Sequence, residues 1–191
     1  VEMMQPGDRV LVSAGFAEEA VVPASEAMRI PETVSFVTAA AFRSNYATAY
    51  YAMQRGRLQA GEVLLVHGAA GGVGLATVDI GKLMGATVIA TASTPEKLAV
   101  CKQLGADHLI NYTRGFREQV RDVTGGRGAD VIFDPVGGDV FDESMRCIAP
   151  FGRLLIVGFT SGRAATAKTN HLLIKAAEAI GFTIGGLSRH D

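Results

Sequence analysis

Apolar runs alternate with segments of helical periodicity from about residue 60 to the end of the chain. The apolar runs are 63–67, 86–92, 107–112, 129–137, 152–159 and 181–186. The segments with helical spacing lie between them, at 74–84, 95–104, 115–124, 140–148 and 170–180. Strands that alternate with helices predict a parallel sheet covered on both faces. Right-handed crossovers then predict an α/β, doubly wound, six-stranded sheet in the order 3-2-1-4-5-6.

The first 60 residues have a different pattern. Short alternating stretches at 9–13 and 16–22 predict two β-strands, with Pro-Gly-Asp before the first and Pro23 after the second. From Thr33 to Gly56 the chain is rich in alanine and carries aromatic residues at helical spacing, which predicts one or two helices.

Composition argues against several classes of protein. The chain has 191 residues, of which 48% are hydrophobic, and its net charge is −1, which argues against a broad nucleic-acid-binding surface. No apolar run approaches the roughly 18 residues of a membrane span, and the first residues do not resemble a signal peptide. Cys101 and Cys147 form no CxxC pair, so we expect reduced thiols, no zinc cluster and a cytoplasmic location.

A glycine cluster joins the first apolar run of the predicted sheet to a helix. Gly71, Gly72 and Gly74 follow the run 63–67, and Ala69 occupies the position of the first glycine in the common G-x-G-x-x-G fingerprint. Unpaired N–H groups at a helix N-terminus bind a pyrophosphate well. The cluster therefore predicts a dinucleotide site; the alternative is a tight strand-to-helix turn without a cofactor.

The end of the second strand indicates which dinucleotide binds. NAD-binding domains place an acidic residue there, whereas this chain has Ser93 followed by Thr94. Lys97 lies one helical turn further on and supplies a countercharge for a 2′-phosphate. This combination favours NADP, unless Lys97 is an ordinary solvated lysine.

Several stretches together resemble a known family. They are RLQAGEVLLVHGAAGGVGLATVDIGKLMGATVIATASTPEKL, KQLGADHLINY, TGGRGADVIFDPVGGDVF and GRLLIVGF. They are similar to the quinone oxidoreductase (zeta-crystallin-like) branch of the medium-chain dehydrogenase/reductase superfamily, in which AAGGVG is the usual form of the glycine motif. The resemblance implies that 43–191 is a Rossmann-like NADP-binding domain. It also implies that 1–42 is a remnant of a GroES-like catalytic domain, most of which this chain lacks.

The resemblance also implies site residues. Each contacts a part of the bound NADPH: Asn45 and Thr48 near the nicotinamide, Gly71, Gly72 and Val73 at the pyrophosphate, Ser93, Lys97 and Tyr112 at the 2′-phosphate, Val136 and Gly137 after the fourth strand, and Gly158 and Phe159 beside the nicotinamide. Thr48 is the only candidate catalytic residue, in a positioning role. For Asp134 we favour capping of the following turn over proton transfer.

The implied activity is hydride transfer from NADPH to a quinone or an α,β-unsaturated carbonyl. Zinc is not expected, because Arg43 and Ser44 stand where relatives that use zinc carry a ligand. Arg43 replaces an apolar residue of the family and either alters the substrate pocket or lies on the surface. The alternatives are an enoyl thioester (acryloyl- or enoyl-CoA) reductase and a non-catalytic, crystallin-like or RNA-binding protein. A homodimer through the edge strand near 181–187 is also expected.

Overall fold

The computed structural model describes residues 4–184. The chain forms two compact units, Val1–Ser44 and Asn45–Asp191. This division falls two residues after the boundary predicted from the sequence. The assignment of the first unit to a GroES-like domain stays a prediction.

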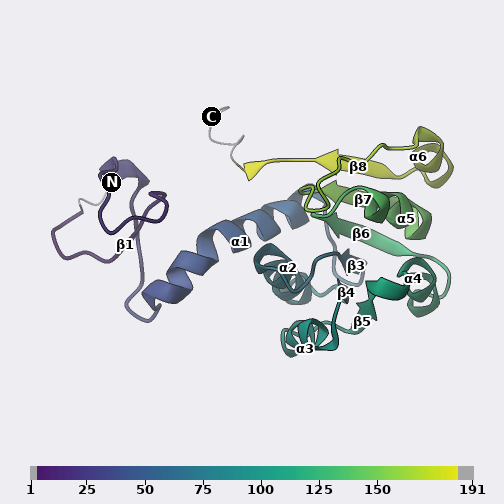
Figure 1. The fold of residues 1–191 in the computed structure, drawn as a ribbon, viewed down its shortest axis with the longest axis horizontal. Helices are drawn as coiled ribbons and strands as arrows, with labels where there is room; N and C mark the ends of the chain where they lie inside the picture. The colour runs from purple at the N-terminus through teal and green to yellow at the C-terminus, as the bar shows by residue number, and fades with distance from the viewer. Residues whose placement is uncertain (1–3, 185–191) are drawn as a thin grey trace. The chain divides into compact units, whose positions relative to one another are not determined.

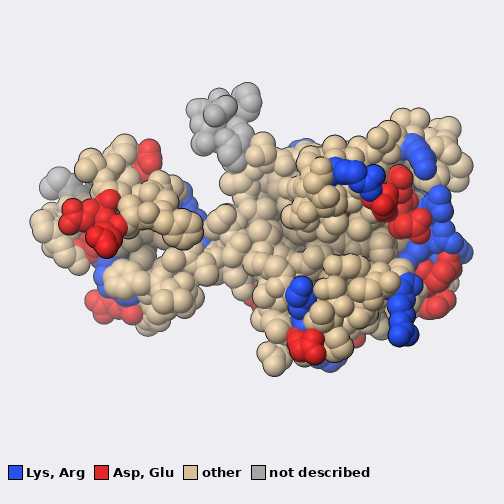
Figure 2. Space-filling model, viewed as in Figure 1, with Lys and Arg blue, Asp and Glu red and all other residues tan. Residues whose placement is uncertain are grey.

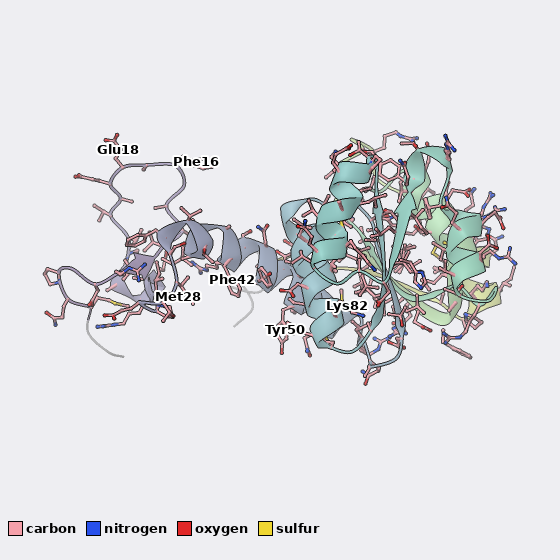
Figure 3. The ribbon with its side chains drawn as sticks, turned by 90° about the horizontal axis from the view of Figure 1, so that it is seen from below. Phe16, Glu18, Met28, Phe42, Tyr50 and Lys82 are labelled. Atoms are coloured by element: carbon pink, nitrogen blue, oxygen red, sulfur yellow. The ribbon has the colours of Figure 1, made fainter. Side chains whose placement is uncertain are left out.

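The first unit contains little regular structure. Strand β1 (Val10–Leu11) pairs antiparallel with β2 (Met28–Arg29), and a single 3-10 turn (Ala24–Glu26) precedes β2. The strand predicted at 9–13 is therefore shorter than expected, and the strand predicted at 16–22 is wrong. Phe16 is fully exposed in a loop, and Figure 3 shows it pointing outward together with Glu18. Residues 16–22 pair with no strand in the described part of the chain, and unpaired extended backbone does not persist as a strand.

A single helix, α1 (Phe36–Arg55), occupies the alanine-rich segment for which the pattern allowed one or two helices. Its second half, from Asn45 onward, belongs to the second unit.

The second unit is the predicted doubly wound sheet (Figure 1). Its six strands are all parallel and lie in the order β5-β4-β3-β6-β7-β8, which confirms the order 3-2-1-4-5-6. The strands are β3 (Val63–Val66), β4 (Thr87–Ala92), β5 (His108–Asn111), β6 (Ala129–Asp134), β7 (Ile148–Ile156) and β8 (Glu178–Gly181). The helices that join them are α2 (Gly72–Leu83), α3 (Pro95–Gln103), α4 (Arg117–Val123), α5 (Asp139–Cys147) and α6 (Thr169–Lys175), with a 3-10 turn (Tyr112–Arg114) after β5.

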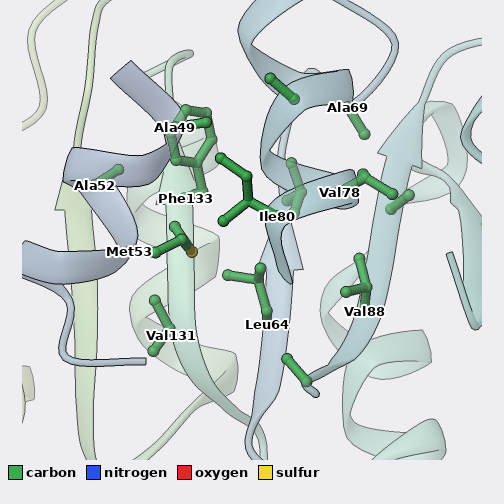
Figure 4. Close-up of a cluster of buried hydrophobic side chains, with 14 of the residues drawn as sticks. Ala49, Ala52, Met53, Leu64, Ala69, Val78, Ile80, Val88, Val131 and Phe133 are labelled. Atoms are coloured by element: carbon green, nitrogen blue, oxygen red, sulfur yellow. The ribbon is translucent and has the colours of Figure 1, made fainter. Parts of the chain in front are cut away.

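Alternate residues of each strand enter two separate cores. Leu64, Val131 and Phe133 pack with Ala52 and Met53 of α1 and with residues of α2 and α3 on one face, as Figure 4 shows for much of this cluster. The intervening strand residues pack against α4, α5 and α6 on the other face. Burial on both faces explains why the strands read as continuous apolar runs rather than as an alternation.

The last two strands differ from the prediction. The helix predicted at 170–180 ends at Lys175, because Ala176 adopts a left-handed conformation and the N–H of Ala177 bonds to the carbonyl of Leu172. Residues 178–181 then pair with β7, so the sixth strand precedes the predicted range 181–186. The predicted dimer segment 181–187 thus shares only Gly181 with β8, and residues 185–187 lie outside the described residues.

Strand β7 begins and ends earlier than the range 152–159. It starts at Ile148 opposite Ala129, and the register then shifts so that Val131 lies opposite Arg153. Phe151, with a φ of 60°, lies within this irregular part. The strand runs through Pro150 because it pairs with β6 on both sides of this irregular part, at Ile148 and from Arg153 onward.

A buried arginine ties the amino-terminal ends of the strands to the end of α1. Arg153 donates from Nε to the carbonyl of Gly56 at 2.8 Å and from Nη2 to the carbonyl of Arg57 at 3.2 Å. Its guanidinium also forms a bidentate pair with Glu62, at 2.7 and 3.0 Å. One side chain thus caps α1 and fixes the turn into β3.

We predict that Arg153→Ala lowers the free energy of unfolding by about 3–5 kcal/mol, because it removes the cationic partner of the half-buried Glu62 carboxylate and the side-chain donor to the carbonyl of Gly56. Urea denaturation measures the change. Arg55→Ala, at an exposed position in the last turn of α1, is the control and should change stability by about 0.5 kcal/mol or less. Equal effects of the two substitutions would contradict this role of Arg153.

Candidate cofactor site

The turn between β3 and α2 is shaped by one close backbone approach. A Cβ on Gly74 would lie 2.3 Å from the carbonyl oxygen of Gly68 and 2.8 Å from Cα of Ala69, so only glycine fits at position 74. The left-handed residue of the turn is Gly68, with a φ of 57°, and Ala69 is completely buried with an ordinary φ. Ala69 can therefore replace the fingerprint glycine, because Gly68 provides the left-handed conformation one residue earlier.

The N-terminus of α2 is open above this turn. Gly71 and Gly72 are exposed, and the first N–H groups of a helix have no partner within the helix. The side chain of Asn45 lies against this turn, since its Nδ2 and Oδ1 atoms are 2.8 and 2.9 Å from the position of a Cβ on Gly72. Thr48 follows Asn45 on the same helix by one turn. The structure thus brings Asn45 to the glycine loop, and its place near a nicotinamide stays a prediction.

The predicted 2′-phosphate residues also lie together. Lys97 Nζ is 3.4 Å from Ser93 Oγ, directly after β4. The side-chain amide of Asn111, at the end of β5, donates to the carbonyl of Ser93 at 3.2 Å, and Tyr112 is the next residue. The ends of two neighbouring strands therefore present a serine, a lysine and a partly exposed tyrosine.

Asp134 organises the turn after β6. Its Oδ1 atom accepts hydrogen bonds from the N–H groups of Val136 at 2.8 Å and Gly137 at 2.9 Å. Burial raises the pKa of Asp134, and these two backbone donors partly offset that rise. The carboxylate therefore caps the turn, as the sequence analysis favoured.

The loop after β7 lies on this turn. The N–H of Thr160 donates to the carbonyl of Pro135 at 3.0 Å, and the N–H of Ser161 donates to the carbonyl of Val136 at 3.1 Å. A Cβ on Gly137 would lie 2.8 Å from Cδ1 of Phe159. The predicted site residues of the two loops, Val136 with Gly137 and Gly158 with Phe159, are thus neighbours.

A pocket of about 940 Å³ opens at the carboxyl ends of β3, β4, β5 and β6. Tyr112 and Val136 line it, as do residues that the sequence analysis missed: His67, Arg114, Phe116, Arg117, Asp139 and Arg146. The only signal for them in the sequence was their place just after predicted strands, or in the helices that follow, on the side where ligands of such sheets bind. Ser93 and Lys97 lie outside the lining.

His67 is a buried residue at the bottom of this pocket. Its ring lies between the hydroxyls of Thr91 and Ser144, with Nδ1···Oγ1 and Nε2···Oγ distances of 3.1 and 2.9 Å, and it makes an edge-type contact with the ring of Phe116. Complete burial lowers the pKa of His67 to about 3. The neutral imidazole therefore joins β3, β4 and α5 beneath the pocket.

The remaining predicted residue, Arg43, bonds within the first unit. Its Nη1 atom donates to Ser13 Oγ at 3.0 Å. Residues 4–184 contain no group of three or more His, Cys, Asp or Glu side chains placed to hold a metal ion. Within the same residues, no helix combines the length and the apolarity needed to cross a bilayer.

Comparison with known proteins identifies the family. A family model described as zinc-binding dehydrogenase matches residues 72–191, which is more than half of the chain. The chain belongs to the zinc-binding dehydrogenase family. Within that family it lies in the quinone oxidoreductase branch of the medium-chain dehydrogenases/reductases, as its relatives show.

Three relatives illustrate the match. A quinone oxidoreductase-like protein 2 homolog of Nematostella vectensis is 42% identical over 198 residues, covering 100% of this chain and 54% of that protein. The quinone oxidoreductase of Thermus thermophilus, solved also with NADPH, is 32% identical with a TM-score of 0.85, covering 98% of this chain and 61% of that one. The CurK enoyl reductase is 28% identical with a TM-score of 0.78, covering 89% and 51%. The chain thus spans about half the length of such relatives.

We predict that His67 makes stability fall with acidification. Its pKa of about 3 in the folded state lies below the ordinary value near 6.5, so the unfolded state binds the extra proton between these values. Its contribution to stability is complete above pH 6.5 and is lost, at about 1.4 kcal/mol per pH unit, as the pH falls toward 3.

NMR titration of the imidazole resonances checks this directly. His67 should show no protonation between pH 8 and 5, and His67→Asn should flatten the pH dependence of urea denaturation, whereas His171→Asn on α6 should not. A His67 that titrates near pH 6.5 in the folded protein would refute the prediction.

Proposed function

We propose that this chain is the cofactor-binding part of an NADPH-dependent oxidoreductase, which transfers hydride to a quinone or an α,β-unsaturated carbonyl without zinc. The observation that carries the proposal is the open N-terminus of α2, where Gly71, Gly72 and Gly74 carry no side chain, next to the group of Ser93, Lys97 and Tyr112. Membership in the quinone oxidoreductase branch, in which the Thermus relative was solved with NADPH, supports it.

The residues present fit NADPH. A pyrophosphate suits the N–H groups and partial positive charge at Gly72 and Val73, because no Cβ stands at Gly71 or Gly72 to block its approach. An adenosine 2′-phosphate suits the hydroxyl of Ser93 and the ammonium of Lys97, and no acidic residue occupies the end of β4, where NAD-binding domains hold the ribose.

The chemistry resides in the bound cofactor, whose nicotinamide supplies hydride to the substrate. The role of the chain is to bind and orient it. Asn45 on α1 lies against the glycine loop, Thr48 follows it by one helical turn, and Gly137 lies beside Phe159. We propose Thr48 as a positioning residue. We assign no acid or base in this chain, because the carboxylate of Asp134 accepts hydrogen bonds from the turn after β6.

Lys97 provides a test of cofactor choice. We predict that Lys97→Ala raises the Kd for NADPH at least about tenfold, since it removes a charged partner of the 2′-phosphate, and leaves the Kd for NADH unchanged. Isothermal titration calorimetry measures both. Lys102→Ala, at the exposed C-terminal end of the same helix, is the matched control. An equal loss of affinity for both cofactors would argue against a 2′-phosphate site.

Turnover provides the test of activity. We predict that the full-length protein that carries this chain consumes NADPH, followed by its absorbance, in the presence of a quinone or a small enone. Tight NADPH binding without oxidation by any quinone, enone or enoyl thioester would overturn the reductase function. It would favour the non-catalytic alternatives, a crystallin-like or an RNA-binding protein. On the face seen in Figure 2, basic and acidic side chains are intermixed, which does not favour RNA.

The second candidate is reduction of an enoyl thioester. The likeness to the CurK enoyl reductase supports it. Parallel assays with a quinone and with crotonyl-CoA separate the two, because the preferred substrate should show the larger kcat/KM. We also retain as proposals a cytoplasmic location and a homodimer formed at the edge of the sheet, which the sequence analysis put near 181–187 and which in the structure is β8.

A further inference from the structure

One hydrogen bond joins α1 to α2 beside the cofactor site. The hydroxyl of Tyr46 donates to Asp79 Oδ2 at 2.8 Å in a partly buried position. This bond holds the phenol in its protonated form, and together with burial and the negative charge of Asp79 it raises the pKa of Tyr46. Neither residue was singled out from the sequence.

Asp79 lies on the same face of α2 as Gly72, the glycine of the loop that begins the helix. Gly72 and Asp79 are seven residues apart, which is two helical turns, so both face α1. Asn45 lies against Gly72, and its neighbour Tyr46 bonds to Asp79. Two adjacent residues of α1 thus contact α2 at two points along its length.

Much of the packing around this bond is apolar, and apolar packing specifies position poorly. Ala49 and Ala52 of α1 and Val78 of α2 are completely buried in the cluster seen in Figure 4. Apolar burial is non-directional, and short alanine side chains offer few ridges to prevent one helix from sliding on another. A hydrogen bond with defined geometry supplies the direction that this packing lacks.

We propose that Tyr46 and Asp79 form a positioning pair, which fixes the register of α1 on α2 and so holds Asn45 at the glycine loop. The inference rests on the proposed NADPH function. It assigns the pair an effect on one half of the cofactor, the pyrophosphate and nicotinamide, because the adenosine 2′-phosphate residues lie directly after β4, on α3 and directly after β5.

The test is Tyr46→Phe, with binding measured by isothermal titration calorimetry for NADPH and for 2′,5′-ADP. The second ligand keeps the phosphate-bearing adenosine half and lacks the nicotinamide half. We expect the Kd for NADPH to rise about three- to tenfold, the equivalent of one hydrogen bond, and the Kd for 2′,5′-ADP to stay within about twofold. A loss confined to the larger ligand is not what general destabilisation would produce.

Two further variants test whether the pair acts as a unit. Asp79→Asn keeps an oxygen acceptor for the hydroxyl and should bind NADPH nearly as the unaltered chain does, whereas Asp79→Ala should match Tyr46→Phe. The double variant with Tyr46→Phe and Asp79→Ala should be no weaker than either single variant. Tyr50→Phe is the matched control, because it removes a hydroxyl from the same helix at a residue that is 57% exposed and that Figure 3 shows pointing away from the helix.

Two results would overturn the inference alone. One is unchanged NADPH binding by Tyr46→Phe, and the other is an equal loss of affinity for NADPH and 2′,5′-ADP, which would indicate only a structural role. Failure of the unaltered chain to bind NADPH would instead overturn the proposed function, and this inference with it.

Discussion

The close approach of α2 to the turn after β3 is the constraint on which the site depends. The first turn of α2 rests on the backbone of Gly68 and Ala69, and any side chain at Gly74 would collide with it. This contact places the helix N-terminus directly at the carboxyl end of the central strand. The positive end of the helix dipole and its free N–H groups then face the edge of the sheet where anions bind.

Several loops are built around that edge by hydrogen bonds to backbone rather than by side-chain packing. Asp134 holds the turn after β6 with two N–H donors, and the loop after β7 bonds to the carbonyls of the same turn. Asn111 fastens the end of β5 to Ser93. Because each loop is fixed at its base, the site can have a defined shape although it consists of connections between strands and helices.

Buried polar groups at this site form hydrogen bonds that hold its turns and strands in place. His67 is neutral and bonds to two hydroxyls under the pocket, and the carboxylate of Asp134 faces its own turn. At the opposite ends of the strands, Arg153 anchors α1 in the same manner. Under the proposed function, in which a bound cofactor supplies the hydride, the chain needs rigid orientation more than it needs titrating side chains.

The sequence by itself determined the layered sheet, its strand order and the glycine loop, because apolar runs, helix punctuation and glycines are local signals that agree with one another. It also placed Ser93 and Tyr112 at the ends of two strands, which parallel pairing brings together, and Lys97 one helical turn after Ser93. Only the tertiary structure decided that residues 178–181 form a strand and 16–22 do not, since strand formation depends on a partner. Only the tertiary structure decided the contacts of His67, of Tyr46 with Asp79 and of Arg153, because their partners lie 24 to 97 residues away along the chain. Such pairings follow from how helices and strands meet, which no local pattern encodes.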